Sequence, residues 1–487
     1  MRMPFYPLMF ILITSFALPL QADETTDTVR NDENRDYESV TSQIFNIDYY
    51  QLDNGIPVIT RKRNNNDLFS IQLVVDVGLR DFPCEDRHLP HVVEHVLFEG
   101  TETFDGKALR ARIFDRGGHW EGYTRDEYTH YTLHIHKNFT DVAIDTLYRM
   151  ITEPTLSQQD TENAIRAVNA EFGTTSHGLQ SWISDTLTIA EQGKNRLYPG
   201  THLACEKRHS PNHLTRSQVE RVFRERYVPA NFTLMVVGQF DPRAVRQQLN
   251  SRFGSLEDKT PPEIIPVAEN PIDYTPIVET EKYGDPTAYF QMFIRADGKG
   301  EPTQAVWELI SQYLTERLFA EIRTQRGIGY TPKVIYNAGP LTGHLEMNVR
   351  TTGDWVDQVE AISLEVYRDM KHNGISEADI NRLKQRMVYE FEAKERENKN
   401  LFQLYRHHTE WIKSQGTMKN LIHEIESVNP ESVAQVINRL PERPLTATLR
   451  PNSFLEAMLK VIGIVLLAAL VALPVYLRGK KRRKTPA

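Results

Sequence analysis

Cysteine and long apolar runs are scarce in this sequence, and basic residues are outnumbered by acidic ones. Two cysteines in 487 residues, Cys84 and Cys205, allow one disulfide at most, and two buried thiols are the alternative. The formal net charge of −8 argues against a nucleic-acid partner, because such partners attract basic surfaces. Long apolar runs occur only near the two ends, so the residues between them are expected to form globular structure.

The N-terminal end has the features of a secretory signal peptide. Residues 1–22 combine Arg2, an apolar run over residues 8–20 and a possible cleavage site after Ala22. An uncleaved anchor is the alternative. Residues 23–44 are polar and acidic, so we expect a disordered leader there.

The C-terminal end is typical of a membrane anchor. Residues 461–477 are predominantly apolar, and their neighbours extend the expected transmembrane helix to residues 455–477. The tail that follows, residues 478–487, is basic, and such clusters stay in the cytoplasm. A buried core helix is the alternative. The sequence thus predicts a single-pass protein of a bacterial inner membrane, with most of the chain in the periplasm.

Between these ends the chain is too long for one hydrophobic core and fits two domains. Prolines cluster over residues 257–276, which favours an extended linker between domains at 45–256 and 277–452. In both domains, runs with a period of two, such as residues 70–77, alternate with helical patterns, such as residues 142–151. This alternation predicts an α+β fold.

The H-x-x-E-H motif formed by His91, Glu94 and His95 carries the strongest chemical signal. Pro90 suits the first turn of a helix, and if residues 90–99 are helical, the two histidines lie one turn apart on one face. Their ring nitrogens can then share a tetrahedral zinc ion. Glu94 can accept a proton from water that the metal activates. This order is the inverzincin signature, and two structural histidines are the alternative.

Three further histidines, His130, His134 and His136, alternate with other residues and would line one face of a strand. A second metal site there is one interpretation. A solvent-exposed face is the interpretation that we favour.

The chain around the motif resembles the pitrilysin-like zinc metallopeptidases over roughly residues 45–449. In that family a glutamate on another helix follows the second histidine by about 76 residues, and Glu171 follows His95 at that separation. Residues 197–201 and 323–330 also match segments of the family. The match therefore involves both halves of the chain.

The resemblance implies a role for each of several residues. His91, His95 and Glu171 would hold one Zn²⁺ per subunit, with Glu94 as the general base. Two residues of the second half would bind substrate and stabilise the reacting carbonyl, namely Arg323 and Tyr330.

The family also has an edge strand that pairs with the substrate backbone, here containing Gly118, Trp120, Glu121 and Gly122. The family pattern Gly-Gly-x-x-Asn-Ala corresponds here to Gly117-Gly118-His119-Trp120-Glu121-Gly122. Because Glu121 takes the place of the usual asparagine, with Trp120 beside it, side-chain preferences near the scissile bond should differ. Family members usually carry a supporting glutamate seven residues before the third ligand, where this chain has Ala164. Losing such support typically weakens metal affinity or activity by about 10- to 100-fold.

The resemblance further implies two structurally similar α/β sandwich-type domains that form half of a clamshell. It implies a homodimer, or a heterodimer with a paralogous chain. The predicted activity is zinc-dependent endopeptidase cleavage of peptides or unfolded polypeptide segments. The alternatives are a non-catalytic binding or assembly subunit and a processing protease for one specific partner.

Overall fold

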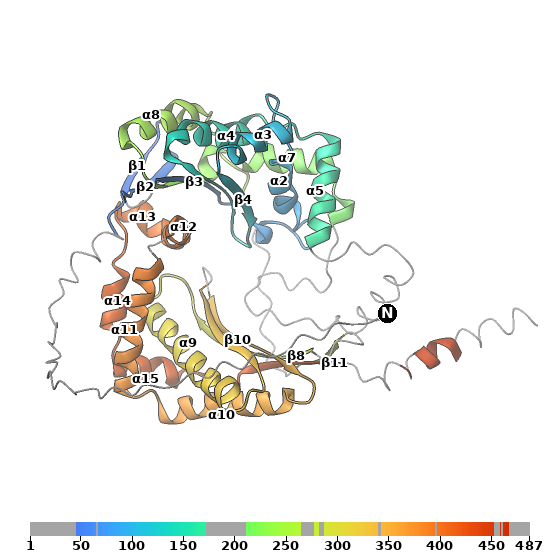
Figure 1. The fold of residues 1–487 in the computed structure, drawn as a ribbon, viewed down its shortest axis with the longest axis vertical. Coiled ribbons are helices and arrows are strands. Elements are labelled where there is room, and N and C mark those ends of the chain that lie inside the picture. Colours follow the sequence, from blue (N-terminus) through green and yellow to red (C-terminus); the bar gives the residue numbers. More distant parts are fainter. Residues whose placement is uncertain are drawn as a thin grey trace, which may run out of the picture.

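The computed structural model describes residues 45–64, 67–171, 211–263, 277–281, 287–338, 342–394, 397–451, 458 and 461–466. In this part of the chain, two sheets each carry a layer of helices on the outside, and the sheets are turned toward the interior (Figure 1). The architecture is α+β with two halves, as the sequence predicts.

Six strands form the first sheet, in the order β1 (Asp48–Gln51), β2 (Pro57–Lys62), β6 (Phe232–Gly238), β3 (Leu68–Val75), β5 (Thr129–His136) and β4 (His119–Thr124). Strands β2 and β6 are parallel, and the other neighbouring pairs are antiparallel. The central strands are buried on both faces, which explains their near-continuous apolar sequence. Strand β4 lies at one edge of this sheet, so its outer side pairs with no other described strand.

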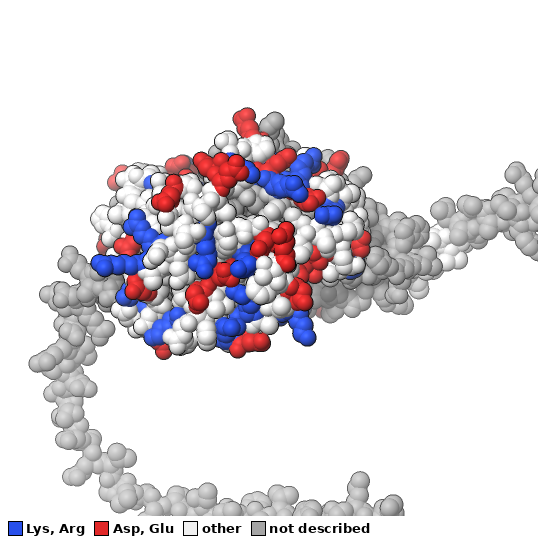
Figure 2. Space-filling view, turned by 90° about the horizontal axis from the view of Figure 1, so that it is seen from above, with Lys and Arg blue, Asp and Glu red and all other residues white. Residues whose placement is uncertain are grey.

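The helices of the first half cover one face of this sheet through a shared hydrophobic core. They are α2 (Leu89–Val96), α3 (Gly106–Phe114), α4 (Thr140–Thr152), α5 (Gln158–Glu171), α7 (Arg216–Arg226) and α8 (Pro242–Arg252). Short 3₁₀ turns occur at Leu79–Asp81, Lys137–Phe139, Pro211–His213, Pro229–Asn231 and Phe253–Ser255. Acidic and basic side chains are interspersed over the outer surface of this layer (Figure 2).

Among the described residues, the second sheet repeats the strand order of the first, with no strand equivalent to β1. Its order is β7 (Ile277–Glu281), β11 (Leu445–Pro451), β8 (Thr287–Asp297), β10 (Thr342–Thr352) and β9 (Tyr330–Ala338). One parallel pair, β7 with β11, again precedes antiparallel pairs, and β9 takes the edge position that β4 has in the first sheet. The shared order agrees with the similar domains that the family resemblance implies.

The remaining helices belong to the C-terminal half of the sequence. They are α9 (Gln304–Leu318), a π-helix (Phe319–Gln325), α10 (Val356–Asn373), α11 (Glu377–Lys394), α12 (Asn398–His407), α13 (Thr409–Gln415), α14 (Leu421–Ser427) and α15 (Pro430–Asn438). Most of them pack on the second sheet. Helices α12 and α13 instead cover the inner face of the first sheet, where Phe402 and Tyr405 pack against Ile59 and Met235.

The packing of α12 on the first sheet corrects one expectation from the sequence. His130 and His134 lie on the face of β5 that α12 covers, and each is only 8% exposed. The solvent-exposed interpretation of that strand face is therefore wrong. The histidine pattern showed that the residues share a face but not that a helix more than 260 residues later buries it.

The transmembrane helix predicted over residues 455–477 is also corrected. In the described part of the chain, every helix is too short or too polar to cross a membrane. From that segment the structure describes residue 458 and residues 461–466. The single-pass inner-membrane location rested on that helix and is corrected with it. Residues 1–44, with the predicted signal peptide and leader, and residues 467–487, with the basic tail, lie outside the described residues.

Candidate metal centre and active site

Helix α2 positions three of the predicted site residues. Pro90 lies in its first turn, where the missing N–H costs no intrahelical hydrogen bond, and Val92, Val93 and Val96 are fully buried against the core. The helix ends at Val96 rather than at residue 99, because the chain continues in tighter turns. In these turns the N–H groups of Phe98 and Glu99 bond to the carbonyls three residues earlier. The motif itself lies wholly within the helix.

His91, His95 and Glu171 bring three potential ligand groups together. His91 Nε2 lies 3.3 Å from His95 Nε2 and 3.1 Å from Glu171 Oε2, and His95 Nε2 lies 3.2 Å from Glu171 Oε1. A tetrahedral zinc ion with bonds of about 2.0–2.1 Å has ligand atoms about 3.3–3.4 Å apart. The spacing of the three side chains therefore fits zinc with little adjustment. Glu171 is the last residue of α5, and its side chain is half exposed.

Burial keeps the two imidazoles in the form that binds metal. It lowers the pKa of His91 to about 4, with the neighbouring His95 acting in the same direction. Burial also lowers the pKa of His95, although the carboxylate of Glu171 opposes this. Neutral imidazole is the form that ligates a metal, so the ring nitrogens are available at neutral pH.

Glu94 has the environment of a general base. Its side chain is 6% exposed, and burial raises its pKa to about 7. A hydrogen bond from Thr124 Oγ1 to Glu94 Oε2, 2.7 Å long, acts against this rise, whereas the nearby charge of Glu171 adds to it. A carboxyl group with a pKa near 7 can both accept and return a proton at neutral pH.

The predicted substrate strand coincides with β4, whose side chains alternate between two environments. Trp120 and Gly122 face the helical layer, where the Trp120 ring lies 5.1 Å from that of Phe98. Glu121 is exposed on the opposite face. A Cβ atom on Gly118, at the start of this segment, would lie 2.5 Å from a backbone oxygen of β5, so glycine keeps the two chains close.

Arg323 and Tyr330 come together in the second half of the chain. The Arg323 guanidinium lies 5.4 Å from the centre of the Tyr330 ring, and both side chains are exposed. Gly327 has a φ of +65°, which turns the chain back after the π-helix. Gly329 packs so closely on Ile322 that a Cβ atom would lie 2.4 Å from it. The pair is on the half of the chain opposite to the zinc-ligand candidates.

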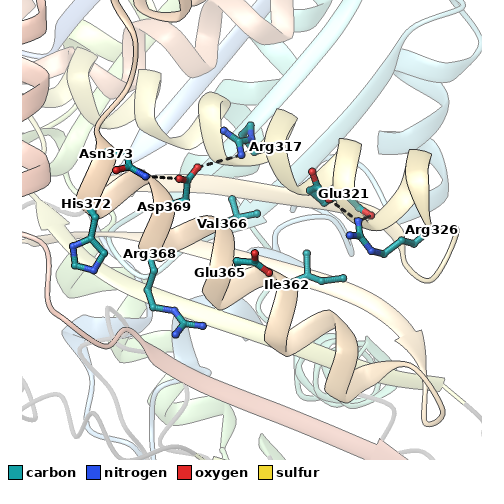
Figure 3. A pocket seen from close by; sticks show the side chains of 10 residues that line it. All are labelled: Arg317, Glu321, Arg326, Ile362, Glu365, Val366, Arg368, Asp369, His372 and Asn373. Carbon is teal, nitrogen blue, oxygen red and sulfur yellow. Dashed lines mark hydrogen bonds and ion pairs between the residues drawn. The ribbon is translucent and has the colours of Figure 1, made fainter.

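A separate hollow of about 670 Å³ lies between the π-helix region and α10 (Figure 3). Within it Arg317 pairs with Asp369 at 3.2 Å, and Arg326 pairs with Glu321 at 2.5 Å. Arginine and carboxylate side chains are mixed along its lining, so the hollow has no concentrated charge of one sign. None of the predicted site residues lines it.

Cys84 is disulfide-bonded, and it lies in the loop before α2. The other cysteine of the sequence, Cys205, lies outside the described residues.

The sequence interpretation missed two groups around the site. Thr124 follows Gly122 by two residues and so shares its strand face, a period-two signal that could have identified it. Glu99 contributes negative charge near His95, and its Oε2 accepts a hydrogen bond from Asn163 Nδ2 on α5 at 3.1 Å. The sequence expectation of a helix over residues 90–99 already puts Glu99 one turn after His95, so this residue could have been identified from the sequence.

Ala164, where the family usually has its supporting glutamate, is fully buried in the hydrophobic core. Position 164 therefore supplies packing rather than charge. Apart from the ligand candidate Glu171, Glu99 is the carboxylate described here that places negative charge beside His95.

Comparisons with known proteins match two family models to this chain. Residues 57–200 match the model of the insulinase family, peptidase family M16, and residues 213–387 match the model described as the peptidase M16 inactive domain. An uncharacterized zinc protease of Streptomyces coelicolor is 22% identical over 289 residues, which are 58% of this chain and 62% of that protein. The uncharacterized zinc protease YmxG of Bacillus subtilis is 22% identical over 409 residues, 80% of this chain and 95% of that protein.

Among solved structures, a protease from Helicobacter pylori has a TM-score of 0.71 at 14% identity, covering 84% of this chain and 100% of that one. At this identity the likeness shows the fold alone. The two family models together match more than half of the sequence, in chain order and across both halves. The chain therefore belongs to the insulinase family of peptidases, M16.

Proposed function

We propose that this protein is a zinc-dependent endopeptidase that cleaves peptides or unfolded polypeptide segments. The observation that carries the proposal is the convergence of His91, His95 and Glu171 at a spacing that fits tetrahedral zinc, with Glu94 beside them. A non-catalytic subunit has no need of a buried carboxylate with a pKa near neutrality at this position.

Each residue then has a defined task. His91, His95 and Glu171 would hold Zn²⁺, which when bound supplies a Lewis acid that activates water and polarises a carbonyl group. Glu94 accepts the proton of the attacking water on its carboxylate and delivers it to the leaving amine. The low exposure of Glu94 keeps bulk water from competing for that proton.

The free edge of β4 supports binding of an extended substrate. Its outer backbone groups have no partner strand in the described sheet, so a peptide can add there as a further strand. Backbone pairing is independent of sequence, which suits unfolded segments. The exposed Glu121 on this strand would then favour substrates with a basic or polar side chain at the facing position.

We further propose that two copies of the chain work together. Arg323 and Tyr330 are exposed and in contact with each other, on the half that does not carry the zinc-ligand candidates. A partner copy would bring its pair to the zinc site, where the guanidinium and phenol groups would stabilise the negative charge on the reacting carbonyl. Two reciprocal sites would result.

The test is the zinc content of the purified protein together with cleavage of a mixed peptide library, mapped by mass spectrometry. We expect about one zinc ion per chain and cleavage inside peptides rather than at their ends. Glu94→Gln should retain zinc but lose at least about 100-fold in turnover, because the amide cannot accept the proton. A zinc-loaded wild-type protein that cleaves no peptide would instead indicate a binding or assembly subunit.

A further inference from the structure

The strand that would receive the substrate also holds the proposed base. Thr124, the last residue of β4, donates its hydroxyl hydrogen to Glu94 Oε2 across a distance of 2.7 Å. A glutamate side chain rotates freely about its last bond unless a partner fixes it. Together with a hydrogen bond from the Thr124 backbone, this bond fixes the plane of the carboxylate.

The direction of the bond follows from the neighbouring hydroxyl. Thr129 Oγ1 lies 3.3 Å from Thr124 Oγ1 and donates its own hydrogen to the carbonyl oxygen of Val77 at 2.9 Å. The Thr124 hydrogen is thus left for the shorter contact with the carboxylate, which is also the stronger type of bond. Thr124 and Thr129 are paired across β4 and β5, so the sheet ladder holds the donor in place.

Gly122 constrains the other oxygen of Glu94. A Cβ atom at this position would lie 2.7 Å from Glu94 Oε1 and 2.6 Å from the ring of Phe98, so the carboxylate packs directly on the backbone of β4. The family pattern has alanine here. The glycine of this chain lets the base approach the strand more closely, with one oxygen against residue 122 and the other bonded to Thr124.

We infer that Thr124 is a positioning residue, which aims the carboxylate of Glu94 by donating a hydrogen bond to Oε2. This inference rests on the proposed function. Because β4 would also align the peptide backbone, one strand fixes both the base and the bond to be cut. Misplacement of a catalytic group by about 1 Å can cost about 100-fold in rate.

The test compares three substitutions of threonine in the same sheet. Thr124→Val keeps the shape and removes the donor, whereas Thr124→Ser keeps the donor. Thr233→Val on β6 is the matched control, because the Thr233 hydroxyl is buried without a hydrogen-bond partner among the described residues. We expect Thr124→Val to lower kcat by about 10-fold or more with KM and zinc content unchanged. Thr124→Ser and the control should stay within about twofold of wild type.

A second measurement does not depend on activity. In protein labelled with carbon-13 at the glutamate carboxyl groups, the signal of Glu94 is identified by its absence in Glu94→Gln. This signal should move in Thr124→Val, return toward its original position in Thr124→Ser, and stay in place in Thr233→Val. It can be recorded with and without zinc.

The outcomes separate the two proposals. If the wild-type protein cleaves nothing, the proposed peptidase function fails, and the carboxyl signal still decides whether Thr124 holds Glu94. An unmoved Glu94 signal in Thr124→Val overturns the positioning role. So does a kcat as low in Thr124→Ser as in Thr124→Val, since the donor would then be irrelevant.

Discussion

Asn398 at the start of α12 is bonded to Ser70 on β3, although 328 residues separate them. The Asn398 side-chain amide donates to Ser70 Oγ at 2.9 Å, and its oxygen accepts a hydrogen bond from Arg63 at 2.8 Å. Both contacts are buried. This asparagine therefore connects a helix from the C-terminal half to the sheet that carries the site.

Asn398→Ala should destabilise the protein by about 1–3 kcal/mol. The substitution leaves the Arg63 guanidinium and the Ser70 hydroxyl buried with fewer partners, and unsatisfied buried polar groups are costly. Chemical unfolding monitored by tryptophan fluorescence measures the change. Asn438→Ala, at an exposed position on α15, is the control and should stay within about 0.5 kcal/mol. Equal stability of the two variants would contradict a linking role for Asn398.

Removing a zinc-ligand candidate should act on the metal itself. His91→Ala and Glu171→Gln each take away one of three converging groups, so the affinity for zinc should fall by more than about 10-fold. Competition with a coloured chelator measures the affinity. Glu102→Gln removes an exposed acid near α2 and should change nothing. Zinc binding at wild-type strength in both ligand variants would refute the ligand set.

Stability should decrease as the pH falls from 7 to 5. Burial lowers the pKa of His130 to about 3 and that of His134 to about 4, whereas an unfolded histidine titrates near about 6.5. Between those values the unfolded chain binds protons that the folded chain does not, so acid favours unfolding. Each histidine should contribute about 1–2 kcal/mol to the decrease.

Unfolding free energies at pH 7 and pH 5 test this expectation. In His134→Asn, the difference between the two pH values should shrink, because one of the buried histidines no longer titrates. His423→Gln, at an exposed position on α14, should leave the difference close to that of wild type. A pH dependence that is identical in all three proteins would show that other groups cause it.

Two inactive variants should restore activity when mixed. Glu94→Gln lacks the base, and a chain with Arg323→Ala and Tyr330→Phe lacks the proposed carbonyl-stabilising pair. In a mixed dimer, one site would receive an intact zinc half and an intact pair, which should recover part of the wild-type turnover. Glu94→Gln mixed with His91→Ala is the control, because every mixed site then has a damaged zinc half. Mixtures that exchange subunits and remain inactive would mean either that the pair acts on the zinc site of its own chain or that the enzyme needs a different partner chain.

The sequence by itself determined the local geometry of the site. His91, Glu94 and His95 lie within one turn of each other because any helix with this spacing puts them there. The alternation that puts Trp120, Gly122 and Thr124 on one side of β4 follows in the same way from strand geometry. Glu171 was found through the family resemblance, since helix geometry reaches no further than about one turn.

Only the tertiary structure decided how these elements meet. The bond between Thr124 and Glu94 depends on how closely β4 packs on α2, and Gly122 allows that distance. The burial of His130 and His134 depends on α12, which arrives from the other half of the chain. Hydrophobic patterns predict which residues are buried. They do not predict which distant element covers them, because that depends on how the whole chain packs.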